Sequence, residues 1–225
     1  MMTGPDEWKV VQVLDSKKNK VYKVEIQGNY LIVKKFDPKF RDNLKTELTL
    51  LKECRNKGLR VPELIDIKDD TLILEYISGT NCKKIFDSRE NVDKILSGIA
   101  EWLARFHTSF GFDKRKGDCI LANFILFDDK IYGIDFEEAQ TGDFLRDLGD
   151  ICTSVLRMRP AFTDEKFNQV EFFLDIYFSK VSKPRVDITE KLVESLLHYS
   201  KYSSQGELMK KWGDKIKEEG LDNIH

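Results

Sequence analysis

Cysteine is scarce in this sequence. Only four of the 225 residues are cysteine, they lie roughly thirty residues apart, and none forms a C-x-x-C pair. That spacing matches neither a zinc site nor a disulfide framework. Scattered cysteines of this kind are typical of a reducing compartment, so we expect a cytoplasmic protein.

Long hydrophobic runs are also lacking. No segment approaches the ~18 apolar residues that a membrane-spanning helix needs, and the first fifteen residues contain no apolar core of a secretory signal. We therefore expect no membrane partner. Charged residues make up 34% of the chain, but the net charge is only -2, so overall charge does not indicate nucleic-acid binding. A hydrophobic fraction of 41% predicts a globular protein with a buried core.

The first third of the chain has the pattern of a small sheet with one helix. Runs of β-branched and aromatic residues predict three strands, over 9–14, 20–26 and 30–36. Gly28-Asn29 is expected to form the turn between the second and the third. Leucines at helical spacing predict a helix over roughly 40–57, which Gly58 ends. The segments VPELIDI and TLILEYI predict two more strands.

Beyond residue 79 the hydrophobic period changes from two residues to 3.6. This predicts five helices, over roughly 88–107, 144–157, 164–180, 188–202 and 205–219. Between the first two, the runs FIL and IYGI predict a hairpin that turns at Asp128-Asp129. The fold class is therefore predicted to be α+β with two lobes. The N-lobe, 1–78, would hold about five antiparallel strands and one helix, and the C-lobe, 79–225, would be mainly helical.

Residues 116–137, KGDCILANFILFDDKIYGIDFE, carry the strongest chemical signal. Asp118 and Asn123 are five residues apart, and Asp135 follows after an apolar run. Phosphoryl transfer needs a carboxylate that orients and deprotonates the attacking hydroxyl, and oxygen ligands that hold a metal ion on the phosphates. The spacing predicts Asp118 as catalytic base and Asn123 and Asp135 as ligands of Mg²⁺, with Mn²⁺ as the alternative. Asp118 or Asn123 alone would more often be a turn former, whereas a carboxylate such as Asp135 directly after an apolar run needs a partner that offsets its desolvation.

This segment resembles the protein-kinase superfamily, whose catalytic loop has D-x4-N and whose metal loop begins D-F. It is more similar to the reduced members: RIO kinases, the small kinase of the KEOPS tRNA-modification complex, and aminoglycoside phosphotransferases. Those carry H-G-D where this chain has Lys116-Gly117-Asp118, and the preceding Leu103 to His107, LARFH, is also similar. The resemblance spans roughly residues 9 to 160. It implies a bilobal protein-kinase-like fold and an ATP-dependent phosphotransferase.

Three further matches occur in the order that the family has them. Lys34 stands at the position of the phosphate-pairing lysine, and Glu47 matches the glutamate that pairs with it. Lys35 is the alternative to Lys34, because successive strand residues face opposite ways, and registry with Glu47 favours Lys34. The stretch LRVPELIDIKDDTLILEYISG resembles the hinge, so backbone groups near Glu75 and Ile77 are implied to meet adenine. The implied cofactor is ATP.

The chain departs from the family in the loop between the first two strands. That loop, DSKKNK, has no glycine, whereas kinases bring backbone amides close to the phosphates there. Its side chains would bind phosphate instead, or the loop is a solvated hairpin tip. The side chains in question are Ser16, Lys17, Lys18 and Lys20.

Two further departures lie around the catalytic segment. Lys116 replaces the histidine of H-G-D and must either reach solvent or have a new role. Only eleven residues separate Asp135 from Asp147, which leaves no room for an activation segment that docks a peptide.

Other polar residues are expected to have structural roles. The residue that corresponds to His107 is structural in the resembling families, and Asp147 matches an aspartate that braces the catalytic loop. Asp143 is predicted to be a turn residue and Asp150 a charge on a helix surface.

The acceptor is indicated by one basic run. Lys114, Arg115 and Lys116 lie just before Asp118, where a basic cluster would attract a polyanion and position its phosphates. Charge runs are also commonly solvated surface. Further candidates for this face are Lys83, Lys84, Arg157 and Arg159. Because reduced archaeal kinases of this kind include tRNA-directed ones, we expect an RNA acceptor first, at a tRNA ribose hydroxyl.

Several alternatives remain open. A protein serine or threonine acceptor, as in RIO kinases, is second, and a small-molecule acceptor is third. A pseudokinase that only binds its partners is a further alternative, given the glycine-free loop and the missing histidine.

Overall fold

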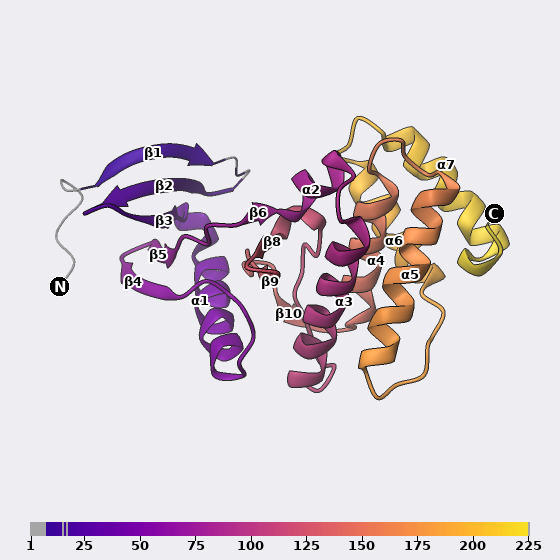
Figure 1. Ribbon diagram of the computed structural model, residues 1–225, viewed down its shortest axis with the longest axis horizontal. Helices are drawn as coiled ribbons and strands as arrows, with labels where there is room; N and C mark the ends of the chain where they lie inside the picture. The colour runs from indigo at the N-terminus through magenta and orange to yellow at the C-terminus, as the bar shows by residue number, and fades with distance from the viewer. Residues whose placement is uncertain (1–7, 15, 17, 225) are drawn as a thin grey trace. The chain divides into compact units, whose positions relative to one another are not determined.

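The computed structural model describes residues 8–14, 16 and 18–224, and the chain divides into two compact units (Figure 1). The first unit contains the chain as far as Ser78 together with Gly133–Glu138. The second contains Gly79–Tyr132 and the residues from Ala139 onward. The segment Gly133–Glu138 thus belongs with the N-terminal residues, although the predicted boundary placed it in the C-lobe.

A five-stranded antiparallel sheet forms most of the first unit, in the order β1-β2-β3-β5-β4. The strands are β1 (Lys9–Leu14), β2 (Lys20–Ile26), β3 (Asn29–Lys35), β4 (Leu64–Lys68) and β5 (Thr71–Glu75). β-Branched and aromatic side chains suit such pleated, half-buried surfaces. Val24, Leu31, Val33 and Ile73 form a buried cluster on the sheet.

The turn between β2 and β3 differs from the prediction by one residue. Gln27 and Gly28 are its central residues, with φ of 49° and 79°, and Ile26 pairs with Asn29. Two positive φ angles give the twist that a two-residue hairpin needs, so the turn forms at Gln27-Gly28 and not at Gly28-Asn29.

Helix α1 (Arg41–Asn56) follows the short 3₁₀ helix η2 (Pro38–Phe40) and buries Leu44, Leu50 and Leu51. Gly58 has a φ of 70°, and the Leu59 N–H donates to the Cys54 carbonyl at 2.9 Å. This bond closes the helix end in the way a glycine in the left-handed region allows.

The second unit holds two small sheets. One has the order β6-β8-β9, and the other pairs β7 with β10. The strands are β6 (Thr80–Asn81), β7 (Lys114–Arg115), β8 (Phe124–Phe127), β9 (Lys130–Gly133, whose last residue belongs to the first unit) and β10 (Gln140–Thr141). Asp128 and Asp129 both have positive φ and turn the predicted hairpin between β8 and β9.

Helices make up the rest of the second unit. They are α2 (Cys82–Ser88), α3 (Val92–Ser109), α4 (Leu145–Leu156), α5 (Asp164–Lys180), α6 (Thr189–Ser200) and α7 (Gly206–Glu219), with 3₁₀ helices η3 (Leu121–Asn123) and η4 (Leu221–Asn223). The predicted helix over 88–107 begins only at Val92, because Arg89 and Asn91 adopt positive φ angles that end α2 and interrupt the helical path. The predicted α+β class is confirmed.

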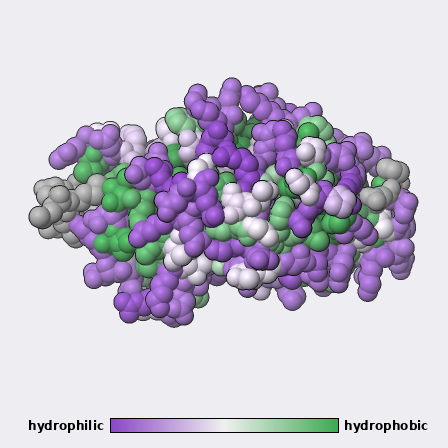
Figure 2. All heavy atoms as spheres, turned by 90° about the horizontal axis from the view of Figure 1, so that it is seen from below, coloured by the Kyte–Doolittle hydropathy of each residue, from purple (hydrophilic) through white to green (hydrophobic). Residues whose placement is uncertain are grey.

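Helix α4 packs on α5 and α6, α3 on α5, and α6 on α7. Gly149 in α4 makes the contact with α6 very close, since a Cβ atom there would lie 2.5 Å from the Lys191 carbonyl oxygen. Figure 2 shows a face that is mostly hydrophilic with smaller hydrophobic areas. Within the described ranges, every helix is too short or too polar to cross a bilayer.

Candidate active site

The predicted site residues fall into two groups, one in each unit. In the first unit, Lys34 near the end of β3 is buried. Its Nζ lies 2.7 Å from Glu47 Oε2 in α1, 2.7 Å from Asp135 Oδ1 and 2.9 Å from Glu137 Oε2. Lys35 is exposed. Strand alternation therefore directs Lys34, and not Lys35, towards Glu47.

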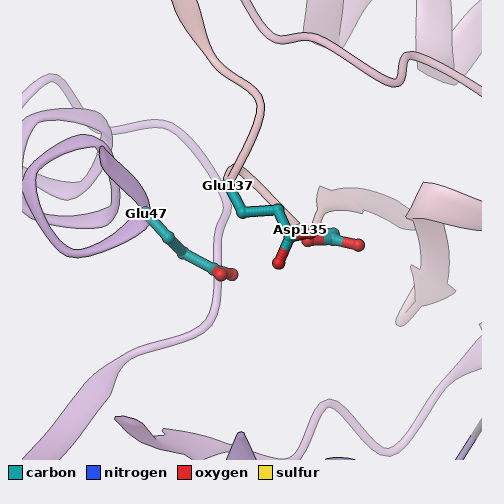
Figure 3. A group of neighbouring side chains, drawn as sticks. All are labelled: Glu47, Asp135 and Glu137. Atoms are coloured by element: carbon teal, nitrogen blue, oxygen red, sulfur yellow. The ribbon is translucent and has the colours of Figure 1, made fainter. Parts of the chain in front are cut away.

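The three carboxylates around Lys34 lie close together. One oxygen from each of Glu47, Asp135 and Glu137 lies within 4.8 Å of the others, and the Glu47 side chain points towards the other two (Figure 3). Burial disfavours the charged form of Lys34, but attraction to the three carboxylates outweighs it and raises the pKa of Lys34. Lys34 is therefore a permanent cation that holds this acidic group together.

The glycine-free loop contacts the same acidic segment through side chains. The Asn19 Nδ2 donates to Glu137 Oε2, Lys18 Nζ bonds to Glu138, and Lys18 Nζ also lies 3.8 Å from Glu137 Oε1. The Ser16 Oγ accepts the backbone N–H of Asn19 at 3.2 Å and so shapes the loop. Neither Asn19 nor Glu138 was predicted as a partner from the sequence pattern.

Two other loop lysines and the hinge residues were also expected near the nucleotide. Lys17 lies outside the described residues, and Lys20 is exposed at the start of β2. Glu75 accepts the Glu63 N–H through its carboxylate at 3.0 Å and donates its own N–H to the Glu63 carbonyl at 2.9 Å. Ile77 is buried. Adenine binding by the backbone near Glu75 and Ile77 stays a prediction.

In the second unit, Asp118 is held at both carboxylate oxygens. The Asn123 Nδ2 donates to Asp118 Oδ2 at 3.0 Å and to the Asp118 carbonyl at 2.8 Å. The Tyr199 hydroxyl of α6 donates to Asp118 Oδ1 at 3.0 Å. Asp118 has a φ of 39°, a region that non-glycine residues seldom enter outside functional sites and turns.

The catalytic segment rests on a buried hydrogen-bond network. Asp147 accepts the backbone N–H of Lys116 at 2.5 Å and that of Gly117 at 3.0 Å. His107 Nε2 lies 3.1 Å from the same carboxylate, and its Nδ1 lies 2.8 Å from the Tyr177 hydroxyl. A neutral imidazole in this place would donate from Nε2 to Asp147 and accept the tyrosine proton at Nδ1. The predicted structural roles of His107 and Asp147 are confirmed.

The prediction that Lys116 belongs to a basic cluster facing the acceptor is wrong. Lys116 is fully buried, and its Nζ lies 5.5 Å from the centroid of Phe124, a distance at which the ring attracts a cation. Asp147 fixes the main chain here, and the Lys116 side chain is directed into the protein, out of reach of an acceptor. Lys114 and Arg115 are half-buried in β7.

Asp150 was predicted on a helix surface, but it is buried between α4 and α6. Its Oδ1 accepts the Ser195 hydroxyl at 2.8 Å. Burial raises the pKa of Asp150 to about 7, the Ser195 hydrogen bond lowers it, and repulsion from Asp147 and Asp118 adds to the rise.

This raised pKa predicts a pH-dependent stability. The folded state holds the Asp150 proton more tightly than the unfolded chain does. The contribution of this proton to the free energy of unfolding is therefore complete below about pH 4 and is lost as the pH rises towards 7. Between pH 5 and 8 the loss at this residue amounts to about 3 kcal/mol. The Asp150→Asn variant should therefore lose less unfolding free energy over this interval than the wild type, measured by urea denaturation. Exposed Asp214 in α7 gives the control Asp214→Asn, and equal losses in all three proteins would contradict the prediction.

Each unit, taken by itself, offers an oxygen donor of the kind that Mg²⁺ prefers. Asp135 offers a carboxylate beside the permanently charged Lys34. Asn123 turns its amide nitrogen to Asp118, so its amide oxygen points elsewhere and is suited to a hard cation. When bound, Mg²⁺ would neutralise charge on the phosphates.

A strand lysine paired with a helix glutamate, a D-x4-N loop and a following aspartate define a kinase-like phosphotransferase domain. The family model of the RIO domain matches residues 11–144, well over half of the chain. The chain therefore belongs to the RIO domain family, and this domain is of the ATP-dependent kinase class.

Two curated relatives share part of this chain. A probable bifunctional tRNA threonylcarbamoyladenosine biosynthesis protein of Methanosphaera stadtmanae is 30% identical over 166 residues, 71% of this chain and 30% of that protein. The EKC/KEOPS complex subunit BUD32 of Encephalitozoon cuniculi is 33% identical over 92 residues, 41% of this chain and 45% of the relative. Each match covers less than half of the relative's length.

Solved structures show the same fold. Amicoumacin kinase hAmiN, in complex with AMP-PNP, Ca²⁺ and Ami, has a TM-score of 0.67 at 12% identity. The match covers 95% of this chain and 88% of that one. At this identity the likeness concerns the fold alone, and it confirms the predicted protein-kinase-like class.

Proposed function

We propose that this protein transfers the γ-phosphate of ATP to a hydroxyl of RNA, first of all a tRNA ribose hydroxyl, in the cytoplasm. The observation that carries the kinase chemistry is the fixed Asp118 carboxylate, which accepts one hydrogen bond from Asn123 and one from Tyr199. A carboxylate oriented in this way suits a general base. Lys34 and Glu47 supply the paired charges that kinases use for the phosphates.

The proposed step conserves atoms and charge. The acceptor oxygen bonds to the γ-phosphorus, and the bond from that phosphorus to the oxygen bridging it to the β-phosphate breaks. The hydroxyl proton passes to Asp118, and ADP leaves. Asn123 and Asp135 would hold Mg²⁺, or Mn²⁺ in its place, and Lys34 would contact the phosphates. Lys18 and Ser16 would take the place of the missing glycine-rich loop.

RNA is favoured over a protein acceptor by two observations. Lys114 and Arg115 form β7, four and three residues before Asp118, where cations attract a phosphate backbone. The Methanosphaera relative is named for tRNA threonylcarbamoyladenosine biosynthesis. A protein serine or threonine acceptor is the alternative. Incubation with labelled ATP and total cellular RNA or protein decides between them by the fraction that becomes labelled.

The basic pair in β7 gives a sharper test. Replacing Lys114 and Arg115 by alanine should weaken RNA binding and lower the slope of log K against log salt by about 0.7 to 0.9 for each lost phosphate contact. ATP hydrolysis should persist. The pair Lys210 and Lys211 in α7 is exposed and gives a matched double-alanine control. If the β7 variant keeps both affinity and salt slope, these two residues are a solvated surface and do not bind RNA.

A further inference from the structure

The C-terminal end of helix α6 reaches the predicted base. Tyr199, in the last turn of α6, donates its hydroxyl to Asp118. Two contacts fix α6 against α4 at this place: the close approach at Gly149 and the hydrogen bond from Ser195 to Asp150. An acceptor hydroxyl that bonds to Asp118 must therefore lie beside Tyr199.

The Tyr199 hydroxyl stays protonated, so it can keep its hydrogen bond to Asp118 while an acceptor hydroxyl binds there. Burial raises the pKa of Tyr199, and repulsion from Asp150 and Asp118 and its hydrogen bond to Asp118 raise it further. The phenol remains protonated and keeps donating to the carboxylate. Because each carboxylate oxygen has more than one lone pair, Oδ1 can accept a second hydrogen bond from an incoming hydroxyl.

Further rings adjoin Tyr199 on the protein surface. The His198 ring centroid lies 5.0 Å from that of Tyr199 and 5.8 Å from that of Tyr202. His198 is exposed, and Tyr202 has 69% of its surface exposed. We call His198, Tyr199 and Tyr202 the α6 aromatic cluster. Exposed rings of this kind are the surfaces on which proteins stack unpaired bases.

Positive charge accompanies these rings. The Arg157 guanidinium lies 5.6 Å from the Tyr199 ring centroid, and Lys201 is exposed between Tyr199 and Tyr202 in the sequence. Cations beside flat rings match a ligand that has both an anionic backbone and an aromatic face. A serine or threonine peptide has neither feature as a rule.

We propose that the α6 aromatic cluster binds an unpaired nucleobase next to the phosphorylated hydroxyl. The proposal rests on RNA as the acceptor. It makes the cluster a base-binding subsite in which Tyr202 and His198 stack on the base and Arg157 contacts the neighbouring phosphate. Asp118 then meets the hydroxyl of a nucleotide whose base is held on α6.

The test compares two probes, a short single-stranded oligoadenylate and an abasic ribose-phosphate chain of the same length. Both carry the same phosphates, so only the first measures base stacking. The wild type should bind oligoadenylate about 5- to 150-fold more tightly, the factor that corresponds to one stacked base. The Tyr202→Leu variant should lose most of this preference, and Tyr202→Phe should keep it because the ring remains.

Phe172, an exposed ring on α5, provides the control Phe172→Leu, which should retain the full preference. Absence of a preference in the wild type, or a full preference in Tyr202→Leu, would overturn the subsite. Transfer from labelled ATP is measured separately. If RNA is labelled while Tyr202→Leu keeps its preference, the subsite is wrong and the RNA-kinase proposal stands. If only protein is labelled, the RNA-kinase proposal fails, and the subsite beside the phosphorylated hydroxyl, which rests on it, fails as well.

Discussion

The Asp118→Ala variant is expected to transfer phosphoryl groups about 10²–10⁴-fold more slowly than the wild type, the usual contribution of a positioned acid–base group. Nucleotide affinity should stay nearly unchanged, because the proposed partner of Asp118 is the acceptor hydroxyl. Single-turnover transfer from labelled ATP measures the first quantity, and titration with a fluorescent ATP analogue measures the second.

A second substitution separates the loss of the carboxylate from any backbone strain that alanine introduces at position 118. Asp118 has a φ of 39°, and alanine enters this region at a cost that asparagine largely avoids. The Asp118→Asn variant should therefore show the same loss of transfer with a melting temperature close to that of the wild type. Exposed Asp113 gives the control Asp113→Ala. Wild-type turnover in Asp118→Asn would remove this residue from the mechanism.

The Asp135→Asn variant should lose the Mg²⁺-dependent part of its ATP affinity. The change removes a carboxylate that would hold the metal ion that neutralises the phosphates. Loss of even an outer partner of a metal ligand typically costs 10- to 100-fold, so we expect at least about a tenfold weakening with Mg²⁺ present. Calorimetric titration with ATP, with and without Mg²⁺, measures the difference.

Asp128 provides a control for this change. It turns the β8–β9 hairpin with a φ of 48°, an angle that asparagine also tolerates, so Asp128→Asn should bind Mg²⁺ and ATP as the wild type does. Equal ATP affinity with and without Mg²⁺ in the wild type would instead favour a pseudokinase that only binds its partners.

Local patterns carry most of the fold in this chain. Helix α5 has the predicted bounds, 164–180, and the β8–β9 hairpin forms at the predicted Asp128-Asp129 turn. Both rest on information within a few residues: hydrophobic period and turn chemistry. The break between α2 and α3 was missed, because positive φ angles at Arg89 and Asn91 have no such local signal.

In the candidate site too, features that depend on local sequence could be predicted, and contacts between distant residues could not. Lys34 could be chosen over Lys35 because a strand alternates its faces and Glu47 follows at a suitable distance. The contact of Tyr199 with Asp118 spans 81 residues, and that of Ser195 with Asp150 spans 45. Neither could be predicted, since a tyrosine or a serine on an amphipathic helix has the same pattern whether it packs in a core or meets an active-site carboxylate. The burial of Lys116 was missed for the same reason.

The helix crossing at Gly149 has a genetic consequence. The group that a side chain at this position would strike is the main-chain carbonyl of Lys191. Every amino acid has this carbonyl, so no exchange at position 191 could act as a second-site suppressor of a larger residue at position 149. Compensation would require a displacement of α4 or α6, and a displacement of α6 would move the hydroxyl that contacts Asp118. The reaction therefore constrains Gly149, a residue that has no side-chain functional group.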